Sequence, residues 1–306
     1  MAKLIVLGSV NADHVLQVDS FPRPGETVLG HGYQVLPGGK GANQAVAAAR
    51  LGADIGFIAC VGDDDFGKRI ITAFEKDGMD TRAVMAVEGM PTGIALIQVA
   101  ANGENSIAIS AEANGCLTVD ALAPHIEFLC GGDTLLLQLE SPMETLELAA
   151  REARSAGVQV ILNPAPAQPL SDALLANLTM ITPNETEAEM LTGVKVETEA
   201  DALQAAKALH GKGVATVIIT LGSKGAFYSG TDGYRMVSGF KVDAKDTTAA
   251  GDTFNGALVA ALQVGKNIDQ AIVFGHAAAA ISVTRLGAQP SIPDLDEVND
   301  FLKDNA

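Results

Sequence analysis

Asp252 stands in a run of small and polar residues that leads from a turn into an Ala-rich stretch, Asp246-Thr247-Thr248-Ala249-Ala250-Gly251-Asp252-Thr253-Phe254-Asn255-Gly256-Ala257. Small side chains let the backbone N–H groups at a helix start close around an anion, and the helix dipole adds partial positive charge. A carboxylate beside such an anion hole suits a base that takes a proton from an attacking hydroxyl. The alternative is that Asp252 only caps the helix, because acidic residues are common in first turns.

A second glycine-containing run also leads into an Ala-rich stretch, Pro37-Gly38-Gly39-Lys40-Gly41-Ala42-Asn43-Gln44-Ala45. It is not a Walker A loop, because Gly rather than Ser or Thr follows the lysine. Gly8-Ser9-Val10-Asn11-Ala12-Asp13 stands after the first expected strand in place of G-x-G-x-x-G, which disfavours a nicotinamide dehydrogenase. The glycines of the second run either let a ligand approach the backbone or form a tight turn.

The composition bounds the class of protein. The chain has 306 residues, 48% of them hydrophobic, and a formal net charge of −17. This charge repels phosphate backbones, so neither nucleic acid nor an anionic membrane is an expected partner. Three widely spaced cysteines indicate buried thiols in a reducing compartment. The first apolar run is too short for a signal peptide and residues 271–283 are too short for a membrane span, so a cytoplasmic protein is expected.

Short aliphatic runs alternate with Ala-rich stretches of helical spacing. The expected strands are residues 4–7, 55–61, 134–139, 158–162 and 214–221, and the expected helices are residues 42–51, 66–76, 143–156 and 200–209. This alternation predicts a three-layer α/β/α fold around a mostly parallel sheet. Ser141 is expected to cap the helix over 143–156. Three consecutive helices, 250–264, 268–284 and 294–302, are expected at the end.

Two segments interrupt this rhythm. Residues 14–37 alternate apolar and polar side chains, and residues 92–99 and 105–111 have the pattern of a hairpin that turns at 101–104. We expect these segments to form a small separate sheet. Because the sequence has no repeats or low-complexity tracts, one domain over residues 1–306 is expected, with a small β-sheet formed by about 12–37 and 91–111.

The two glycine-containing runs occur together, and their joint pattern resembles the two signatures of the ribokinase-like carbohydrate kinase family. The resemblance extends over the whole chain through Gly8-Ser9-Val10-Asn11-Ala12-Asp13-His14, Asn163-Pro164-Ala165-Pro166-Ala167, Thr182-Pro183-Asn184-Glu185-Thr186-Glu187 and Gly287-Ala288-Gln289-Pro290-Ser291. Ala249 is a departure, since many members have Gly there, but Ala is expected to start the helix equally. The resemblance implies ATP-dependent phosphorylation of a small sugar, D-ribose at its 5-hydroxyl, to ribose 5-phosphate and ADP.

The resemblance also implies a role for each matching residue. The sugar would be bound by Asn11, Asp13, Gly38, Gly39, Lys40, Asn43, Glu140 and Asp252, with Asp252 as general base and an anion hole at Ala249, Ala250 and Gly251. ATP would contact Asn184, Thr220, Gly222, Ser223, Gly225, Gly251 and His276. Without the family match, Glu140 is more simply a charge that flanks a helix, and His276 a packed core histidine.

Two metal ions follow from the same resemblance. Magnesium would neutralise charge on the transferred group, with Glu187 in a supporting role toward the ion and its waters, although the acidic run around Glu187 also suits a solvated helix start. Potassium would lie near the anion hole, mostly against backbone carbonyls, which suit a large cation better than magnesium. The matching potassium positions are Asp246, Thr248, Ser282, Arg285, Gly287 and Ser291.

The small sheet resembles the lid of the family, which covers the sugar and pairs with a second subunit. Covering the site excludes water, which would otherwise accept the phosphoryl group. Apolar faces over residues 15–18 and 94–99 would then explain a homodimer.

Two alternatives to ribose phosphorylation remain at this stage. One is a kinase for another small sugar, such as deoxyribose or fructose, or for a nucleoside; the other is a sensor of sugars or nucleotides without catalysis. The polar set Asn11, Asp13, Asn43 and Glu140 favours a small polyhydroxylated ring, since only 4% of the residues are aromatic and could wall a base. A sensor has no need of a base beside an anion hole, so Asp252 argues against the last alternative.

Overall fold

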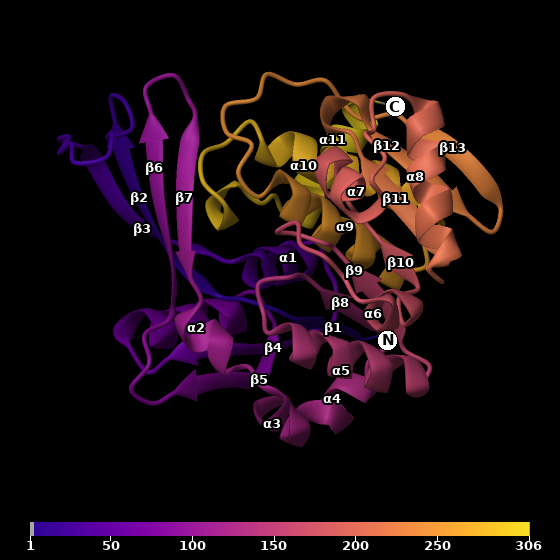
Figure 1. Ribbon diagram of the computed structural model, residues 1–306, viewed down its shortest axis with the longest axis horizontal. Helices are drawn as coiled ribbons and strands as arrows, with labels where there is room; N and C mark the ends of the chain where they lie inside the picture. The colour runs from indigo at the N-terminus through magenta and orange to yellow at the C-terminus, as the bar shows by residue number, and fades with distance from the viewer. Residues whose placement is uncertain (1–2, 306) are drawn as a thin grey trace.

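The computed structural model describes residues 3–305, so Met1, Ala2 and Ala306 of the expected domain range lie outside the described residues. Two sheets of different size organise this part of the chain (Figure 1). Within residues 3–305 the larger sheet has nine strands in the order β13-β12-β11-β10-β9-β8-β1-β4-β5, and the smaller has four in the order β3-β2-β6-β7. The separate small sheet predicted from the sequence is therefore confirmed.

The larger sheet is mostly parallel, as the alternation predicts. Every neighbouring pair from β11 across to β5 is parallel, and only the pairs β11–β12 and β12–β13 are antiparallel. Its strands are β1 Leu4–Leu7, β4 Ile55–Gly62, β5 Asp80–Val87, β8 Thr134–Leu137, β9 Gln159–Leu162, β10 Met180–Ile181, β11 Thr216–Thr220, β12 Ala226–Gly230 and β13 Gly233–Val237. The sequence patterns missed β5, β10, β12 and β13.

Helices cover both faces of the larger sheet, so the three-layer α/β/α fold is confirmed (Figure 1). One face buries α1 Lys40–Arg50, α2 Asp65–Lys76, α9 Ala250–Gln263, α10 Ile268–Ser282 and α11 Leu295–Asp304; the other buries α3 Val119–Leu122, α4 Ile126–Cys130, α5 Met143–Ser155, α6 Asp172–Ala176, α7 Glu185–Thr192 and α8 Glu199–Gly211. Residues of β1 alternate between the two cores, with Leu4 in one and Ile5 in the other. Among the described helices, none has the length and apolar character that crossing a membrane requires.

The prediction that Ser141 caps α5 is wrong. The helix begins at Met143 and its N-cap is Pro142, without a capping side chain. Pro142 has an extended ψ of 129°, so it stays outside the helix, and its carbonyl accepts the N–H groups of Thr145 and Leu146. Ser141 is thereby displaced one residue from the cap, and its buried Oγ has no hydrogen-bond partner within residues 3–305.

The expectation of three buried thiols is also wrong in part. All three cysteines are free, but only Cys60, on β4, is buried. Cys116 and Cys130 are half-buried because each ends a short helical segment at the margin of the molecule, Glu112–Cys116 and α4.

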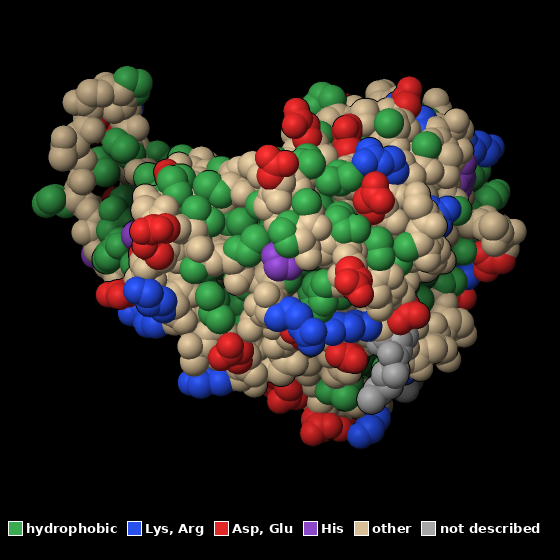
Figure 2. All heavy atoms as spheres, turned by 90° about the horizontal axis from the view of Figure 1, so that it is seen from below, with side chains coloured by type: hydrophobic (Ala, Val, Ile, Leu, Met, Phe, Trp, Pro, Cys, Tyr) green, Lys and Arg blue, Asp and Glu red, His purple; other side chains and the backbone are tan. Residues whose placement is uncertain are grey.

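The smaller sheet consists of β2 Asn11–Val18, β3 His31–Gly38, β6 Gly93–Ala100 and β7 Asn105–Ser110, and we call it the lid sheet. It stands out from the main body as an arm that carries exposed hydrophobic side chains (Figure 2). Two polar contacts attach it. Asp64, at the start of α2, accepts hydrogen bonds from the N–H (2.7 Å) and hydroxyl (2.9 Å) of Thr92, and Asn114 donates to Asn11 Oδ1 at 2.8 Å. The base of the arm is therefore fixed to the larger sheet.

Candidate active site

Asp252 lies in the first turn of α9 and is buried, with 6% of its surface exposed. Its carboxylate points to α1, where Asn43 Nδ2 donates to Oδ2 at 3.0 Å and Gln44 Nε2 donates to Oδ1 at 2.9 Å. No side chain caps α9 in the described structure, so the reading of Asp252 as a mere cap is not supported. The two amides hold this buried carboxylate between α1 and α9, and a carboxylate held in one orientation suits the role of a general base.

Backbone N–H groups with no acceptor lie next to this carboxylate. Ala250 N–H donates to the carbonyl of Thr247 at 3.2 Å, and Thr253 N–H donates to that of Ala249 at 2.8 Å. Between them, the N–H groups of Gly251 and Asp252 donate to no acceptor among residues 3–305. Unsatisfied N–H groups at a helix start form a site for an anion. The predicted anion-hole positions are thus at the start of α9, although the N–H of Ala250 is already engaged.

Ala249, the N-cap of α9, has φ 57° and ψ 15°. This is the left-handed region, which costs a residue with a side chain about 1–2 kcal/mol and costs glycine almost nothing. Ala249 therefore starts the helix with local backbone strain that a glycine at this position would not have.

Asp13, Lys40 and Glu140 lie around Asp252 as a cluster of charges. The pKa of Asp13 is raised from 3.8 to about 7, mainly by burial and then by the charges of Glu140 and Asp252, while the charge of Lys40 lowers it. The pKa of Lys40 is raised, mainly by Asp252, against the effect of burial and with smaller contributions from Glu140, Glu187 and Asp13. These mutual effects show that the structure brings the predicted sugar-binding charges together.

Glu140 contacts α1 rather than α5. Its Oε2 accepts hydrogen bonds from Ser9 Oγ at 2.5 Å and from the backbone N–H of Lys40, the first residue of α1, at 2.9 Å. A carboxylate at a helix N-terminus is stabilised by the helix dipole. Glu140 therefore belongs to the cluster and not, as the simpler alternative had it, to the helix that follows it in sequence.

The two glycines before α1 have different roles in the structure, and of the two readings offered by the sequence the tight turn is confirmed. Gly38 lies against the carboxyl group of Asp13, where a Cβ would stand 2.0 Å from Oδ2. Gly39 is the N-cap of α1 and has φ 89°, which is the left-handed turn conformation. One glycine permits close approach and the other permits the turn.

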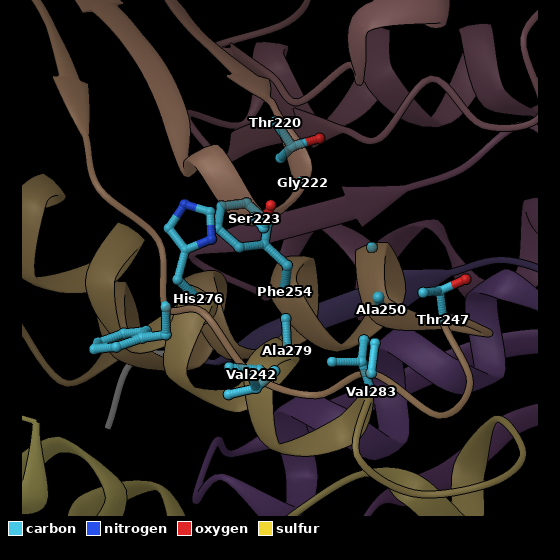
Figure 3. Close-up of a pocket in the computed structure, with 14 residues that line it drawn as sticks. Thr220, Gly222, Ser223, Val242, Thr247, Ala250, Phe254, His276, Ala279 and Val283 are labelled. Atoms are coloured by element: carbon cyan, nitrogen blue, oxygen red, sulfur yellow. The ribbon is translucent and has the colours of Figure 1, made fainter.

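Two adjoining cavities open beside the start of α9 and share Thr220, Gly222, Thr247, Ala250 and Gly251. The first, of about 290 Å³, extends from His276 and Phe254 to Thr247 and Ala250, and its walls are mostly apolar (Figure 3). The second, of about 370 Å³, contains Lys40, Asn184, Glu187 and Asp252. Of the predicted ATP contacts, Gly225 lies outside both cavities, because it packs against the backbone of Val237 and Gly239.

His276 is both a packed residue and a cavity residue. Its ring lies 4.9 Å from that of Phe254 between centroids, and Figure 3 shows the two rings together with Ser223 beside them. Burial lowers the pKa of His276 to about 4, so the ring is neutral at neutral pH. Its Nε2 has no hydrogen-bond partner in the described part of the chain. This buried ring nitrogen therefore has capacity for a hydrogen bond from a molecule in the cavity.

Asn184 and Glu187 are joined in the capping box of α7. Asn184 Oδ1 accepts the N–H of Glu187 at 2.8 Å, and Glu187 Oε2 accepts that of Asn184 at 2.9 Å. Glu187 is buried, which raises its pKa, so the solvated-surface alternative fails for this acid. Nowhere in residues 3–305 do three or more His, Cys, Asp or Glu side chains form a group that could hold a metal ion.

The predicted potassium positions lie on the loop before α9 and on the segment that runs from Ser282, the last residue of α10, to Ser291, and these two segments pair through the backbone. The N–H groups of Lys245 and Asp246 donate to the carbonyl of Val283. The Asp246 carboxylate accepts the N–H of Thr248 at 2.9 Å and of Gly287 at 2.8 Å, which joins the loops a second time. The remaining side chains point elsewhere: Ser282 and Ser291 hydrogen-bond to nearby carbonyls and Arg285 pairs with Glu297.

Sequence reasoning missed the residues that hold the predicted ones. Asn114 hydrogen-bonds to Asn11, and Gln44, Gln138 and Asn163 form a chain of buried amides beside Asp252. Gln44 and Asn163 lie within the motifs of residues 37–45 and 163–167. Their amide side chains in such apolar surroundings are the sequence signal that could have identified them as supports of the site. The apolar cavity walls at Phe240, Val242 and Ala244 come from an irregular segment that gives no periodic signal.

Comparisons with known proteins agree with this architecture. Residues 1–295 match the pfkB family carbohydrate kinase. A ribokinase of Haemophilus influenzae is 54% identical over 300 residues, which cover 98% of each chain. The structure of a Thermotoga maritima ribokinase has a TM-score of 0.91 at 43% identity and covers 99% of this chain and 100% of that one. An Arabidopsis thaliana ribokinase complexed with ribose and ATP has a TM-score of 0.91 at 35% identity, with 99% of each chain covered. This chain belongs to the pfkB family of carbohydrate kinases and is a sugar kinase.

Proposed function

We propose that the chain transfers the γ-phosphoryl group of ATP to the 5-hydroxyl of D-ribose, giving D-ribose 5-phosphate and ADP. The observation that carries the proposal is the buried Asp252 carboxylate, held by two amides next to N–H groups that have no acceptor in residues 3–305. Ribose as the sugar is supported by the names of the relatives from H. influenzae and T. maritima. ATP is supported by the Arabidopsis complex.

Asp252 serves as the general base in this proposal. Each of its oxygens accepts one amide N–H and keeps a second lone pair for the proton of the sugar hydroxyl. As the hydroxyl oxygen bonds to the γ-phosphorus, its proton passes to Asp252 and the bond from phosphorus to ADP breaks. The anion hole at Ala249 to Gly251 receives the negative charge of the moving group through the N–H of Gly251, since that of Ala250 already donates to Thr247.

The sugar is held by the polar groups that surround Asp252, namely Asn11, Asp13, Gly38, Gly39, Lys40, Asn43 and Glu140. Asn43 Oδ1 is buried and has no partner within the described chain, so it has capacity for a hydroxyl. Asp13, with a pKa near 7, both donates and accepts at neutral pH, which suits a hydroxyl group equally.

The nucleotide occupies the two cavities. The apolar wall with Phe254 and the neutral His276 contacts the adenine base of ATP. Thr220, Gly222 and Ser223 contact the phosphate groups, which extend toward Gly251. Asn184 lines the second cavity and contacts the phosphate end. Gly225 acts only by shaping the loop that carries Gly222 and Ser223.

The residues present fit both proposed ions. Glu187 faces the second cavity as a single buried acid, which suits magnesium held mainly by ATP phosphates and water, where the ion supplies charge neutralisation. The paired loops of Asp246, Thr248, Ser282, Arg285, Gly287 and Ser291 offer one carboxylate and many carbonyls, a donor set that suits potassium. Replacing potassium by sodium should depress activity without unfolding the protein; equal rates with both cations would contradict this site.

The assembly of the chain and its location in the cell are also part of the proposed function. The chain acts as one domain whose lid sheet closes over the sugar and pairs with that of a second copy, in the cytoplasm. The apolar side chains exposed on the lid sheet, among them Ile107 and Ile109, support the pairing.

A coupled assay of ADP release tests the main proposal. Ribose, deoxyribose, fructose and adenosine are compared at several concentrations, with Asp252→Asn as the control for ADP released by contaminants. We expect the highest kcat/KM with ribose and a phosphorylated 5-carbon in the product by NMR. A higher kcat/KM with any of the other three acceptors would contradict ribose as the substrate.

A further inference from the structure

We propose that Gln44 is a positioning residue, which holds the Asp252 carboxylate in the orientation that accepts the proton of the sugar. The inference rests on the proposed function of Asp252. It concerns a residue that lies too deep to touch either substrate, since Gln44 has 0% of its surface exposed.

Both hydrogens of the Gln44 amide are committed. Its Nε2 donates to Asp252 Oδ1 at 2.9 Å and to Asn163 Oδ1 at 2.9 Å. Asn163 is fixed in turn, because its Nδ2 donates to the carbonyl of Thr182 at 3.1 Å. Gln44 therefore ties the carboxylate on α9 to the end of β9, a rigid element of the larger sheet.

The orientation of the Gln44 amide is set from its other side. Gln138 Nε2 donates to Gln44 Oε1 at 2.7 Å, so the oxygen faces β8 and the NH₂ group faces Asp252. Gln138 is itself buried, and Gly8 packs against it so closely that a Cβ there would lie 2.2 Å from Gln138 Oε1. The chain Gln138, Gln44, Asp252 thus runs from the sheet to the proposed base.

Gln44 also lies where α1 and α9 touch. A Cβ on Gly256 would stand 2.5 Å from the carbonyl of Gln44, so the two helices are in backbone contact one turn after Asp252. Asn43, the other donor to Asp252, has a buried Oδ1 without a partner among residues 3–305, whereas every polar side-chain atom of Gln44 is used inside the protein. The two residues therefore differ in role: Asn43 contacts both the sugar and Asp252, whereas Gln44 contacts Asp252 alone.

A double-mutant cycle separates positioning from general stability. Gln44→Met keeps the size of the side chain and removes its amide. Alone it should lower kcat by ~10- to 10²-fold, the loss expected from removing one hydrogen bond to a charged group. KM for ribose and for ATP should change by less than roughly threefold, because ground-state binding does not use Gln44. In the Asp252→Asn background it should lower kcat no further, because the two residues act as one unit.

Thr145→Val is the matched control. It removes the buried hydrogen bond from Thr145 Oγ1 to the carbonyl of Leu117, which lies on the opposite face of the sheet, so it should lower the melting temperature and leave kcat unchanged. The inference is overturned if Gln44→Met lowers kcat by the same factor in both backgrounds, or if its whole effect lies in KM. Full turnover in Asp252→Asn alone would instead overturn the proposed base, a distinguishable result.

If Gln44→Met does not fold, Gln138→Met is the second variant that tests the positioning role of Gln44. Loss of the bond that orients Gln44 should lower kcat by less than tenfold in the wild-type background and not at all in Asp252→Asn. A wild-type kcat in Gln138→Met would then overturn the inference.

Discussion

The polar cluster at the start of α9 and the lid sheet are built in opposite ways. In the cluster, Asp252, Asn43 and Gln44 are buried and joined by hydrogen bonds within the chain. On the lid sheet, Ile107 and Ile109 each expose about half of their apolar surface. The contrast teaches that the polar cluster is organised by contacts within the chain, while the lid sheet keeps apolar surface that a partner could bury.

The largest effect should come from the polar cluster. Asp252→Asn removes the charge that accepts the proton and keeps the size of the side chain, so kcat should fall by ~10²- to 10⁴-fold, the range for loss of a general base. Folding, measured by circular dichroism, and sugar binding, measured by calorimetry, should both survive. Turnover near that of the wild type would show that the organised cluster has a structural purpose only.

The pH dependence of protein stability tests the charges of the polar cluster, of which Asp13 has the largest expected effect. Asp13 keeps its proton up to a pKa of about 7 in the folded protein, against 3.8 for an ordinary aspartate, mainly through burial and then through the charges of Glu140 and Asp252. The folded state therefore binds more protons between these values, and its stability falls as the pH rises through this window. The full difference corresponds to about 4 kcal/mol from this group.

The comparison with Asp13→Asn isolates that contribution. Urea unfolding at several pH values from 4 to 8 should show the variant gaining stability relative to the wild type as the pH rises. His276 titrates in the same window with the opposite sign, since its pKa is lowered to about 4, but it is present in both proteins and cancels. Parallel stability curves for the two proteins would mean that Asp13 titrates as it would in water.

A charge on the lid sheet tests the other side of the comparison. The strand pairing places Ile107, Ile97 and Val15 on the face that also carries Asp13, whereas Leu96 and His14 lie on the opposite face. Ile107→Lys should raise the dissociation constant of the proposed dimer by roughly 10- to 10²-fold, since a buried isoleucine contributes about 1.5–3 kcal/mol. Sedimentation equilibrium measures the change. Leu96→Lys, at similar exposure but on the opposite face, should leave the dimer intact. A larger effect of Leu96→Lys than of Ile107→Lys would place the interface on the face of Leu96 and His14.

The two regions also differ in how far the sequence predicts them. Short aliphatic runs predicted β1, β4, β8, β9 and β11, because burial on both faces leaves a continuous apolar pattern, and Ala-rich stretches of helical spacing predicted α1, α2, α5 and α8. β10 has only two residues, and β5 begins with Asp80 and Arg82, so neither pattern is visible. The types of the site residues were predicted by family resemblance. Their supports, such as Gln138, were not, since a contact between residues 94 positions apart has no local signal.

The smallest effect on stability and turnover is expected at Ala249, the N-cap residue at which the loop meets α9. Its φ of 57° costs an alanine about 1–2 kcal/mol, and glycine would remove that cost while adding about 0.5–1 kcal/mol of chain entropy in the unfolded state. Ala249→Gly should therefore change the free energy of unfolding by no more than about 1 kcal/mol, toward greater stability, with kcat within a factor of ~3. Ala249→Val is the contrasting variant, because a β-branched side chain tolerates positive φ poorly and should lower both stability and kcat. A glycine variant that loses most of its turnover while it gains stability would show that the strain at Ala249 itself keeps the N–H of Gly251 in place, so that the organisation of the cluster extends one residue beyond the helix.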